Sequence, residues 1–448
     1  MQGFVLFLET RFVPIAAKIG GQRHLVAIRD AFAGLMPLIL VGAFAVLLNN
    51  VFFVPWSLLA YEGLLGADHP FIVWAFEHVA PLFSLMESGT LAILSLGLTF
   101  SLGYNRALVE DNDPLPTGLI NVAVFIMLGA LVREQEVFSW VGNYLASQGI
   151  FFSLLVGLLA PEVYFAVVRK NWVIKLPEQV PPAVMRGFLA VIPGFITIFV
   201  FAVVAYIFNV IIGVNLFNWF ETNIAQALMI FAQSIWSVMA ISLLICLFWF
   251  FGLHGANIME AIMGPLYTPA LLQNVDLYQR GITAVGTGAE EMSVWVRSSW
   301  DAYVFMGGSG ATLPLIVAIL LFSKLVEHRQ VAKLGVAPGI FMINEPITFG
   351  IPIVLNPIFF IPFVIVQPIL AAVAYILTAV GFAAPIVNYI PWVTPPIISA
   401  LLATNGNLGA GFTALLNLGI AFIIYLPFVI VANKHQEKVE EKAKELTS

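Results

Sequence analysis

Two short phrases place titratable side chains inside otherwise apolar sequence. The first, WFFGLHGAN, ends a long apolar run and contains Trp249, His254 and Asn257. The second, GIFMINEPITFG, places Asn344 and Glu345 between apolar segments, directly before a proline. Because an isolated carboxylate is very costly to bury, Glu345 needs a partner or a ligand. An imidazole and a carboxylate can bind hydroxyl groups, and together they supply a potential base near neutral pH.

Each of these residues also has a structural interpretation. His254 could be a neutral imidazole at a helix end, satisfied by a carbonyl, and Glu345 could be a structural cap or half of a buried ion pair. A zinc ion would need a third ligand, and neither phrase contains another His or Cys. We therefore expect no metal and no other cofactor.

Aromatic and amide side chains are found near the same phrases. A sugar has apolar C–H faces and polar edges, so it suits an aromatic platform surrounded by amides and carboxylates. Trp249 is the strongest aromatic candidate because it lies close to His254 in the sequence; for the others an interfacial aromatic belt is at least as good an explanation. The remaining candidates are Trp295, Trp300, Trp392, Asn257, Gln273, Asn274, Asn344, Asn356 and Asn388.

The composition requires a membrane environment. Of the 448 residues, 60% are apolar or aromatic and only 10% are charged, whereas soluble proteins contain roughly 25% charged residues. This excludes a soluble enzyme and a disordered chain and favours a protein that crosses the bilayer several times. The net charge of −6 and the lack of a basic stretch argue against a nucleic-acid partner. The single cysteine, Cys246, lies in an apolar run and is expected to be a small buried side chain.

Apolar runs of about 20 residues predict membrane-spanning helices. Three further apolar stretches, residues 255–272, 335–356 and 391–402, contain Pro, Gly or Asn and are expected to be broken. Irregular backbone persists in a bilayer only where it is buried in protein or lines a cavity, so broken helices point to a transport site; a proline-kinked ordinary helix is the alternative. The nine uninterrupted runs are 31–53, 85–104, 117–132, 149–168, 187–213, 228–251, 305–322, 359–380 and 409–432.

The positions of Lys and Arg predict the orientation. Basic residues gather before the first run (Arg11 to Arg29), in the connections 169–186 and 324–333, and in the tail from residue 434. Both termini are then cytoplasmic, which requires an even number of crossings. We predict an all-α polytopic membrane protein with about ten transmembrane helices. Its expected parts are an N-terminal membrane scaffold (1–185), a substrate-handling half with the broken helices (186–433) and a charged cytoplasmic tail (434–448).

The phrase GGSGATLPL, from Gly307, precedes an apolar helix and could form an anion cradle at the helix N-terminus. It lacks the lysine of a P-loop, so close packing of small residues is the better explanation.

Several phrases together resemble a known family. They are AIRDAFAGLMPLILVGAF from Ala27, LPEQVPPAVMRGFLAVIPG from Leu176, GLHGANIMEAIMGPL from Gly252, GGSGATLPL and GIFMINEPITFGIPIVLNP from Gly339. In order and over nearly the whole chain, they resemble the membrane-embedded enzyme IIC component of the bacterial phosphotransferase system, in its lactose/cellobiose/diacetylchitobiose branch.

The resemblance implies a homodimer in the bacterial plasma membrane, joined through its N-terminal halves. Each C-terminal half would hold two re-entrant helical hairpins around a disaccharide and move to carry it inward. A separate enzyme IIB would then donate a phosphoryl group from a phosphocysteine to the sugar 6-hydroxyl, and Glu345 would accept or orient the hydroxyl proton. The implied substrate-binding residues are His254, Glu345, Trp249, Asn257, Asn344 and Trp392, with Glu345 and His254 also the catalytic candidates.

Two other functions fit the residues. An ion-coupled secondary transporter that releases unmodified solute would also contain broken helices and a buried Glu. A membrane-embedded hydrolase or transferase could use Glu345 and His254 as acid and base, although the sequence reveals no second carboxylate converging on them.

Overall fold

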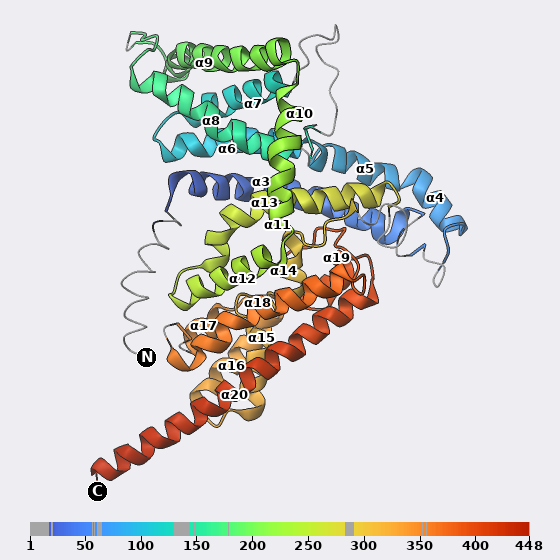
Figure 1. Ribbon diagram of the computed structural model, residues 1–448, viewed down its shortest axis with the longest axis vertical. Helices are drawn as coiled ribbons and strands as arrows, with labels where there is room; N and C mark the ends of the chain where they lie inside the picture. The colour runs from blue at the N-terminus through green and yellow to red at the C-terminus, as the bar shows by residue number, and fades with distance from the viewer. Residues whose placement is uncertain are drawn as a thin grey trace.

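The structure is a computed structural model. In the part of the chain that it describes, all regular secondary structure is helical (Figure 1). The described residues are 18, 21–55, 57, 59–60, 65–129, 144–146, 149–177, 179–282, 291–351, 353–354 and 356–447. Arg11 and residues 130–132 of the predicted run 117–132 lie outside them.

The N-terminal helices form one bundle. Helix α6 packs against α3, α7 and α8, and α9 packs on α7 and α8, so that α6 to α9 lie stacked in Figure 1. Wider π-helical turns extend α3 to Phe53 and α9 to Ile212. The helices are α3 (Arg23–Leu48), α4 (Pro70–His78), α5 (Ala80–Ser88), α6 (Leu94–Val109), α7 (Pro114–Gly129), α8 (Ile150–Arg169) and α9 (Pro182–Tyr206).

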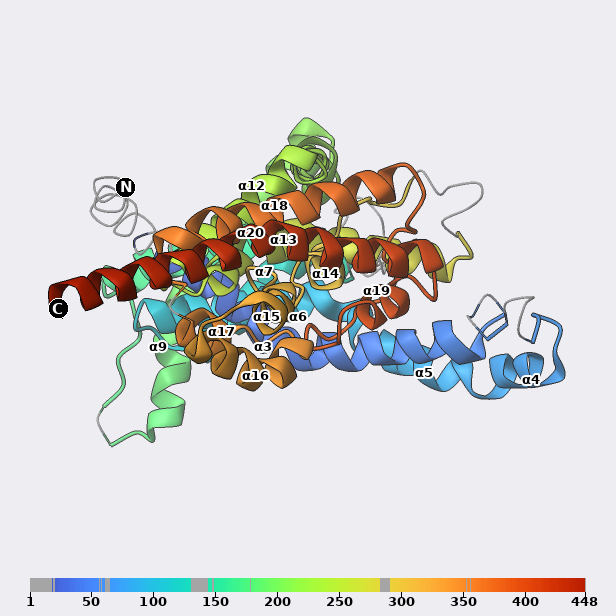
Figure 2. The same cartoon turned by 90° about the horizontal axis from the view of Figure 1, so that it is seen from below.

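The later helices form a second group. Helix α18 packs between α12 and α20, and α15 packs against α16 and α20, while α13 contacts both α12 and the N-terminal helices α3 and α8. Figure 2 shows the C-terminal end of α20 and the consecutive helices α4 and α5 protruding at opposite ends of the molecule. These helices are α10 (Leu216–Phe220), α11 (Gln226–Ala232), α12 (Ile235–Phe250), α13 (Gly255–Gln279), α14 (Arg297–Tyr303), α15 (Thr312–Phe322), α16 (Val326–Ile340), α17 (Glu345–Gly350), α18 (Pro357–Ala379), α19 (Ile398–Ala403) and α20 (Leu408–Thr447).

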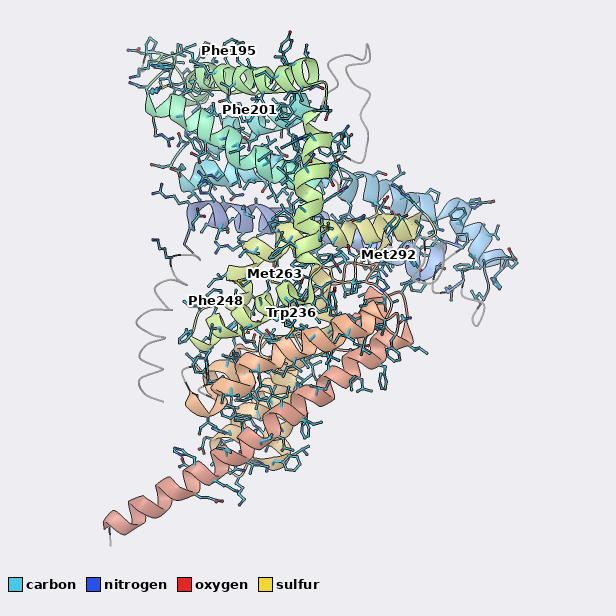
Figure 3. The ribbon with its side chains drawn as sticks, viewed as in Figure 1. Phe195, Phe201, Trp236, Phe248, Met263 and Met292 are labelled. Atoms are coloured by element: carbon cyan, nitrogen blue, oxygen red, sulfur yellow. The ribbon has the colours of Figure 1, made fainter. Side chains whose placement is uncertain are left out.

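Large apolar side chains cover the outside of the molecule as well as its core. Phe195 on α9 is 69% exposed and Trp236 on α12 is 74% exposed, and both are labelled in Figure 3. Such surfaces are stable against lipid or against another apolar protein surface, and not in water. Six described helical segments are long and apolar enough to cross a membrane, or seven if α11 and α12 together form one span, and α7 and α15 are shorter apolar helices. The number of ten crossings stays a prediction.

Two predictions of helix continuity are wrong. Residues 255–272, expected to be broken, lie within the unbroken helix α13, which accommodates Pro265 and Pro269. Residues 228–251, expected to be one helix, divide into α11 and α12, which meet at 66°. The side chain of Gln233 fixes this bend, because its amide donates to the backbone oxygen of Trp295 (2.7 Å) and accepts from the Trp295 N–H (3.0 Å).

The other two broken stretches are confirmed. Residues 335–356 contain the end of α16, a turn, the short helix α17 and the cap of α18. Residues 391–402 lead from irregular backbone into the short helix α19. The predicted run 305–322 becomes helical only at Thr312, and residues 434–447 continue α20 rather than forming a separate element.

A charged cluster joins α3, α6 and α8 at one end of the bundle. The fully buried Arg106 on α6 bonds Glu162 on α8 and lies 3.4 Å from Glu110, which also pairs with Arg23 on α3 at 3.2 Å. Because three helices contribute to this cluster, it fixes their relative position where α6 ends.

Candidate functional site

His254 caps the N-terminus of α13, at the turn that follows α12. Its Nδ1 accepts a hydrogen bond from the backbone N–H of Asn257 at 3.2 Å. A neutral imidazole whose Nδ1 is an acceptor has its proton on Nε2. The Nε2 atom lies 3.8 Å from Oε1 of Glu345. The local fold thus directs an N–H donor toward the carboxylate.

Glu345 begins α17, and the loop before it is held by close packing. The buried amide of Asn344 donates to the hydroxyl of Thr348 at 3.0 Å. Gly308, with φ +94°, lies so near that a Cβ there would be 2.6 Å from the Met342 carbonyl oxygen and 2.7 Å from Oδ1 of Asn344. The glycine-rich phrase therefore serves close packing, the better of the two explanations considered for it.

The gap between imidazole and carboxylate is the central feature of the site. A separation of 3.8 Å between Nε2 and Oε1 is too long for a hydrogen bond. Both side chains are 44% exposed, so neither is sealed by protein. A hydroxyl oxygen placed between them could accept from Nε2–H and donate to Oε1, each at ordinary hydrogen-bond length.

A cavity of about 580 Å³ opens beside this pair. Five of the six predicted site residues line it, namely His254, Asn257, Asn344, Glu345 and Trp392. Its volume and its mixture of polar and aromatic walls suit a small polar organic ligand.

The sixth predicted residue, Trp249, has a different position. It is only 2% exposed, and its ring centroid lies 4.5 Å from that of His254, at an interplanar angle of 48°. Trp249 is not among the residues that line the cavity. It therefore packs against the imidazole and orients it, and direct contact between Trp249 and a ligand stays a prediction.

Sequence reasoning did not assign a role to a charged cluster in the same cavity. Arg297 on α14 donates to Glu260 on α13 through Nε and Nη2, both at 2.9 Å, and to Asp301 through Nη1 at 2.9 Å. All three line the cavity, so the expectation that no second carboxylate converges there is wrong. The signal lay in the sequence, because Arg297 lies between Trp295 and Trp300 and Asp301 follows directly, in a chain with few charges.

The cluster of Arg297, Glu260 and Asp301 borders a second chamber of about 320 Å³. Arg297, Asp301 and Trp392 are among the residues common to both spaces, and the second chamber extends to Met36 on α3 and to Tyr389. The site therefore offers polar contacts at some distance from His254 and Glu345.

The fold and the site together define a class: an all-helical multi-pass membrane protein whose interrupted helices enclose a polar cavity, which is the architecture of a transporter. Residues 29–367 match the model of the family described as phosphotransferase system, EIIC, and the chain belongs to that family.

Similar proteins cover the whole chain. It is 35% identical, over 98% of its length and 99% of the relative's, to the cellobiose-specific EIIC component of Lactococcus lactis subsp. lactis (strain IL1403). It is 34% identical, over 99% of its length and 97% of the relative's, to the cellobiose-specific EIIC component of Geobacillus stearothermophilus. The crystal structure of ChbC, the IIC component of the N,N′-diacetylchitobiose-specific phosphotransferase system, superposes with a TM-score of 0.85 at 31% identity, covering 97% of this chain and 99% of ChbC.

Proposed function

We propose that the protein is the sugar-transporting membrane component of a phosphoenolpyruvate-dependent phosphotransferase system and that it takes up a disaccharide of the cellobiose/diacetylchitobiose class. The observation behind this proposal is the 3.8 Å space between His254 and Glu345, which matches a bridging hydroxyl, beside a cavity of about 580 Å³. The printed specificities of the relatives, for cellobiose and for N,N′-diacetylchitobiose, support the sugar class.

In the proposed mechanism, the sugar 6-hydroxyl occupies the space between His254 and Glu345. The Nε2–H of His254 donates to O6, and Glu345 accepts the hydroxyl proton as O6 attacks phosphorus. The O6–P bond forms while the S–P bond of a phosphocysteine breaks, leaving a thiolate on the donor. Catalysis then consists mainly of positioning and charge stabilisation. Asn257, Asn344 and the cavity-lining Trp392 would bind the rest of the sugar.

The phosphocysteine belongs, in this proposal, to a partner protein, the enzyme IIB. The one cysteine of this sequence, Cys246, is fully buried, and its thiol lies 3.0 Å from Oε1 of Gln367. A thiol in such a position cannot reach a phosphoryl donor or a sugar in the cavity.

We propose that the protein is a homodimer with both termini in the cytoplasm, joined through its N-terminal scaffold. The predicted division into 1–185, 186–433 and 434–448 is retained with one refinement. Because α9 packs on α7 and α8, we propose that the scaffold includes α9.

Two alternatives predict different products. An ion-coupled secondary transporter would accumulate unmodified sugar, whereas the proposed system delivers a sugar 6-phosphate. A membrane-embedded hydrolase would turn over sugar in detergent without moving it. The pairing of Glu260 and Asp301 with Arg297 argues against hydrolysis, because both carboxylates are already engaged with a cation.

A binding panel tests the proposal. Radiolabelled lactose, cellobiose and diacetylchitobiose would be presented by equilibrium dialysis to the native protein and to Glu345→Gln and His254→Ala. We expect one or more sugars to bind the native protein and both variants to bind at least about tenfold more weakly, because each loses a hydrogen bond that involves a polar or charged partner. Identical binding by all three proteins would refute the site. Addition of phosphorylated enzyme IIB should convert bound sugar to its 6-phosphate, and unmodified sugar would favour the secondary transporter.

A further inference from the structure

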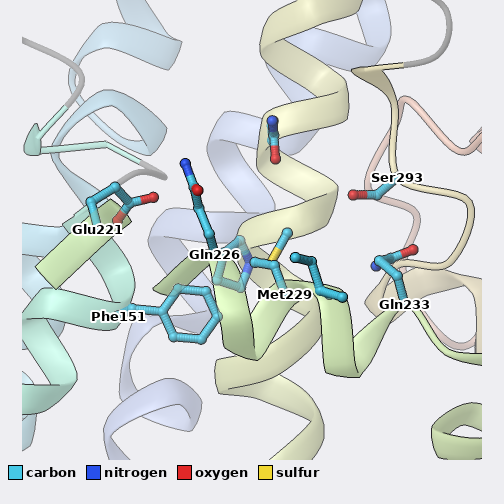
Figure 4. A pocket seen from close by; sticks show the side chains of 9 residues that line it. Phe151, Glu221, Gln226, Met229, Gln233 and Ser293 are labelled. Atoms are coloured by element: carbon cyan, nitrogen blue, oxygen red, sulfur yellow. The ribbon is translucent and has the colours of Figure 1, made fainter. Parts of the chain in front are cut away.

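A second polar cleft lies outside the site already described. It has a volume of about 660 Å³ and lies where α8, α11 and α13 meet (Figure 4). In Figure 4, Glu221 and Gln226 occupy one side of this cleft, Gln233 and Ser293 occupy the other, and the ring of Phe151 forms part of its wall. We call it the amide cleft, after its polar lining of Glu221, Gln226, Gln233, Gln273 and Ser293 beside Phe151.

The chemistry of the amide cleft fits a neutral, hydroxyl-rich ligand. None of the nine described residues that line it is cationic, so among them a phosphate or another anion would find no counter-charge. Amides offer both donors and acceptors, and a carboxylate accepts strongly, which is the set that ring hydroxyls require. Oε2 of Glu221 is buried and has no hydrogen-bond partner among the described residues. An unpaired carboxylate oxygen of this kind is a ready acceptor for a ligand hydroxyl.

The amide cleft and the main cavity share two structural elements, helix α13 and the segment from Ser293 to Arg297, although no described residue lines both. Gln233 is bonded at both polar atoms to the backbone of Trp295, two residues before Arg297. Gln273 lies on α13, the helix that also carries Glu260, and is 13 positions further along it, which corresponds to about 20 Å of helix. Helix α9 starts at the basic connection 169–186, which is cytoplasmic in the proposed orientation. The first residues of the amide cleft's polar lining follow the far end of α9 in the chain, so the cleft lies toward the outer surface.

We propose that the amide cleft is a second carbohydrate-binding site, at which sugar from outside is received before it reaches the cavity of His254 and Glu345. This inference rests on the proposed function for the identity of the ligand as a disaccharide. The site is weaker than the main one, because two of its amides, Gln226 and Gln273, are exposed and must be ordered on binding.

The single buried cysteine makes a protection experiment possible. Native protein should react little with a small maleimide, since Cys246 is fully buried. Gln226→Cys would place one accessible thiol in the amide cleft, and Gln330→Cys, at an exposed position on α16, would be the matched control. The protein would be studied in lipid nanodiscs without sugar-headed detergents, because a maltoside headgroup could itself occupy the cleft.

We expect saturating cellobiose or diacetylchitobiose to slow labelling of Gln226→Cys several-fold and to leave Gln330→Cys unchanged. Protection should persist when Glu345→Gln is added, since the amide cleft binds sugar by itself. Adding Glu221→Ala should raise the half-protecting sugar concentration about tenfold, through loss of a charge-assisted hydrogen bond.

Three results would overturn the amide cleft as a sugar site. One is unchanged labelling of Gln226→Cys in a protein that still binds disaccharide at the main site by dialysis, which would leave the proposed function standing. Another is protection that disappears with Glu345→Gln, because the effect would then come from the main cavity. The third is protection by short-chain phosphatidylglycerol but by no sugar, which would identify a lipid site. Failure of the native protein to bind any sugar in dialysis would instead refute the proposed function.

Discussion

Replacing Arg297 with methionine removes the guanidinium that two cavity carboxylates share. Arg297 bonds Glu260 and Asp301 at 2.9 Å, and the side chains of the three residues are 16%, 29% and 10% exposed, respectively. Methionine keeps most of the side-chain length without the charge. The Arg297→Met variant would therefore leave two carboxylates side by side in a largely enclosed space.

The expected loss of unfolding free energy follows from the burial of these three side chains. Removing one partner of a buried ion pair costs about 3–5 kcal/mol, because the remaining charge loses its compensation. Glu260 retains some contact with cavity water, so we expect the lower end, about 3 kcal/mol. A matched control is Lys324→Met, which breaks a 3.0 Å pair with Glu437 whose side chains are 74% and 53% exposed. Exposed pairs contribute about 0–1 kcal/mol.

The assay is the free energy of unfolding from denaturant titration in mixed micelles. We expect a clear loss for Arg297→Met and almost none for Lys324→Met. A triple variant that adds Glu260→Gln and Asp301→Asn should regain most of the loss, since it removes the uncompensated charges. If Arg297→Met and Lys324→Met unfold at the same denaturant concentration, the cluster does not stabilise the site and the reasoning fails.

Three further predictions concern packing, buried polar groups and pH. Gly308→Ala should weaken sugar binding about tenfold or more in dialysis, because the added Cβ would displace Asn344 and with it the loop before α17. The control is Gly281→Ala, at a glycine with φ +83° and no described atom within 4 Å of the added Cβ. This control shares only the backbone strain and should bind sugar normally. Asn417→Leu should lower the unfolding free energy by about 1–2 kcal/mol, because the amide donates to two carbonyl oxygens at 2.8 and 3.0 Å, and an unchanged value would contradict this role. Burial raises the pKa of Glu110, but the two neighbouring guanidinium groups lower it more, so its net pKa is below the ordinary value. The Glu110 carboxylate therefore stabilises the fold fully above its unfolded-state pKa of about 4.3, and this stabilisation is lost as the pH falls through the lower folded-state pKa. In a pH series of unfolding measurements, Glu110→Gln should lack the loss of stability that comes from protonating Glu110.

Helix continuity was only partly predictable from the sequence. Proline and glycine marked 255–272 as broken, yet α13 accommodates Pro265 and Pro269 without interruption, as membrane helices can when neighbouring groups satisfy the freed carbonyls. Conversely, the run 228–251 contains no proline or glycine, and its 66° bend depends on hydrogen bonds between Gln233 and the distant Trp295. Local patterns do not reveal a bend that a residue 62 positions away stabilises.

The candidate site, like helix continuity, was only partly predictable from the sequence. His254 and Glu345 stood out because charged groups are rare in apolar sequence, and the structure brings them to 3.8 Å although they are 91 residues apart in the chain. Arg297 and Asp301 were overlooked because they lie in a more polar stretch that resembled a connection. Trp249 was correctly associated with His254, but whether its ring faces the cavity or the protein depends on the packing around it.

Composition determined that this chain lies in a membrane, and its apolar runs of about 20 residues determined that it is helical, since a helix satisfies the backbone groups of such a run in lipid. The sequence also located the few polar groups at membrane depth, because their energetic cost makes them rare. Only the tertiary structure decided which of those groups meet, which are paired with Arg297 and which, like Oε2 of Glu221, have no hydrogen-bond partner among the described residues. Those outcomes depend on distances of a few ångströms between helices remote in the sequence, and hydrogen bonds and ion pairs form or fail over such distances.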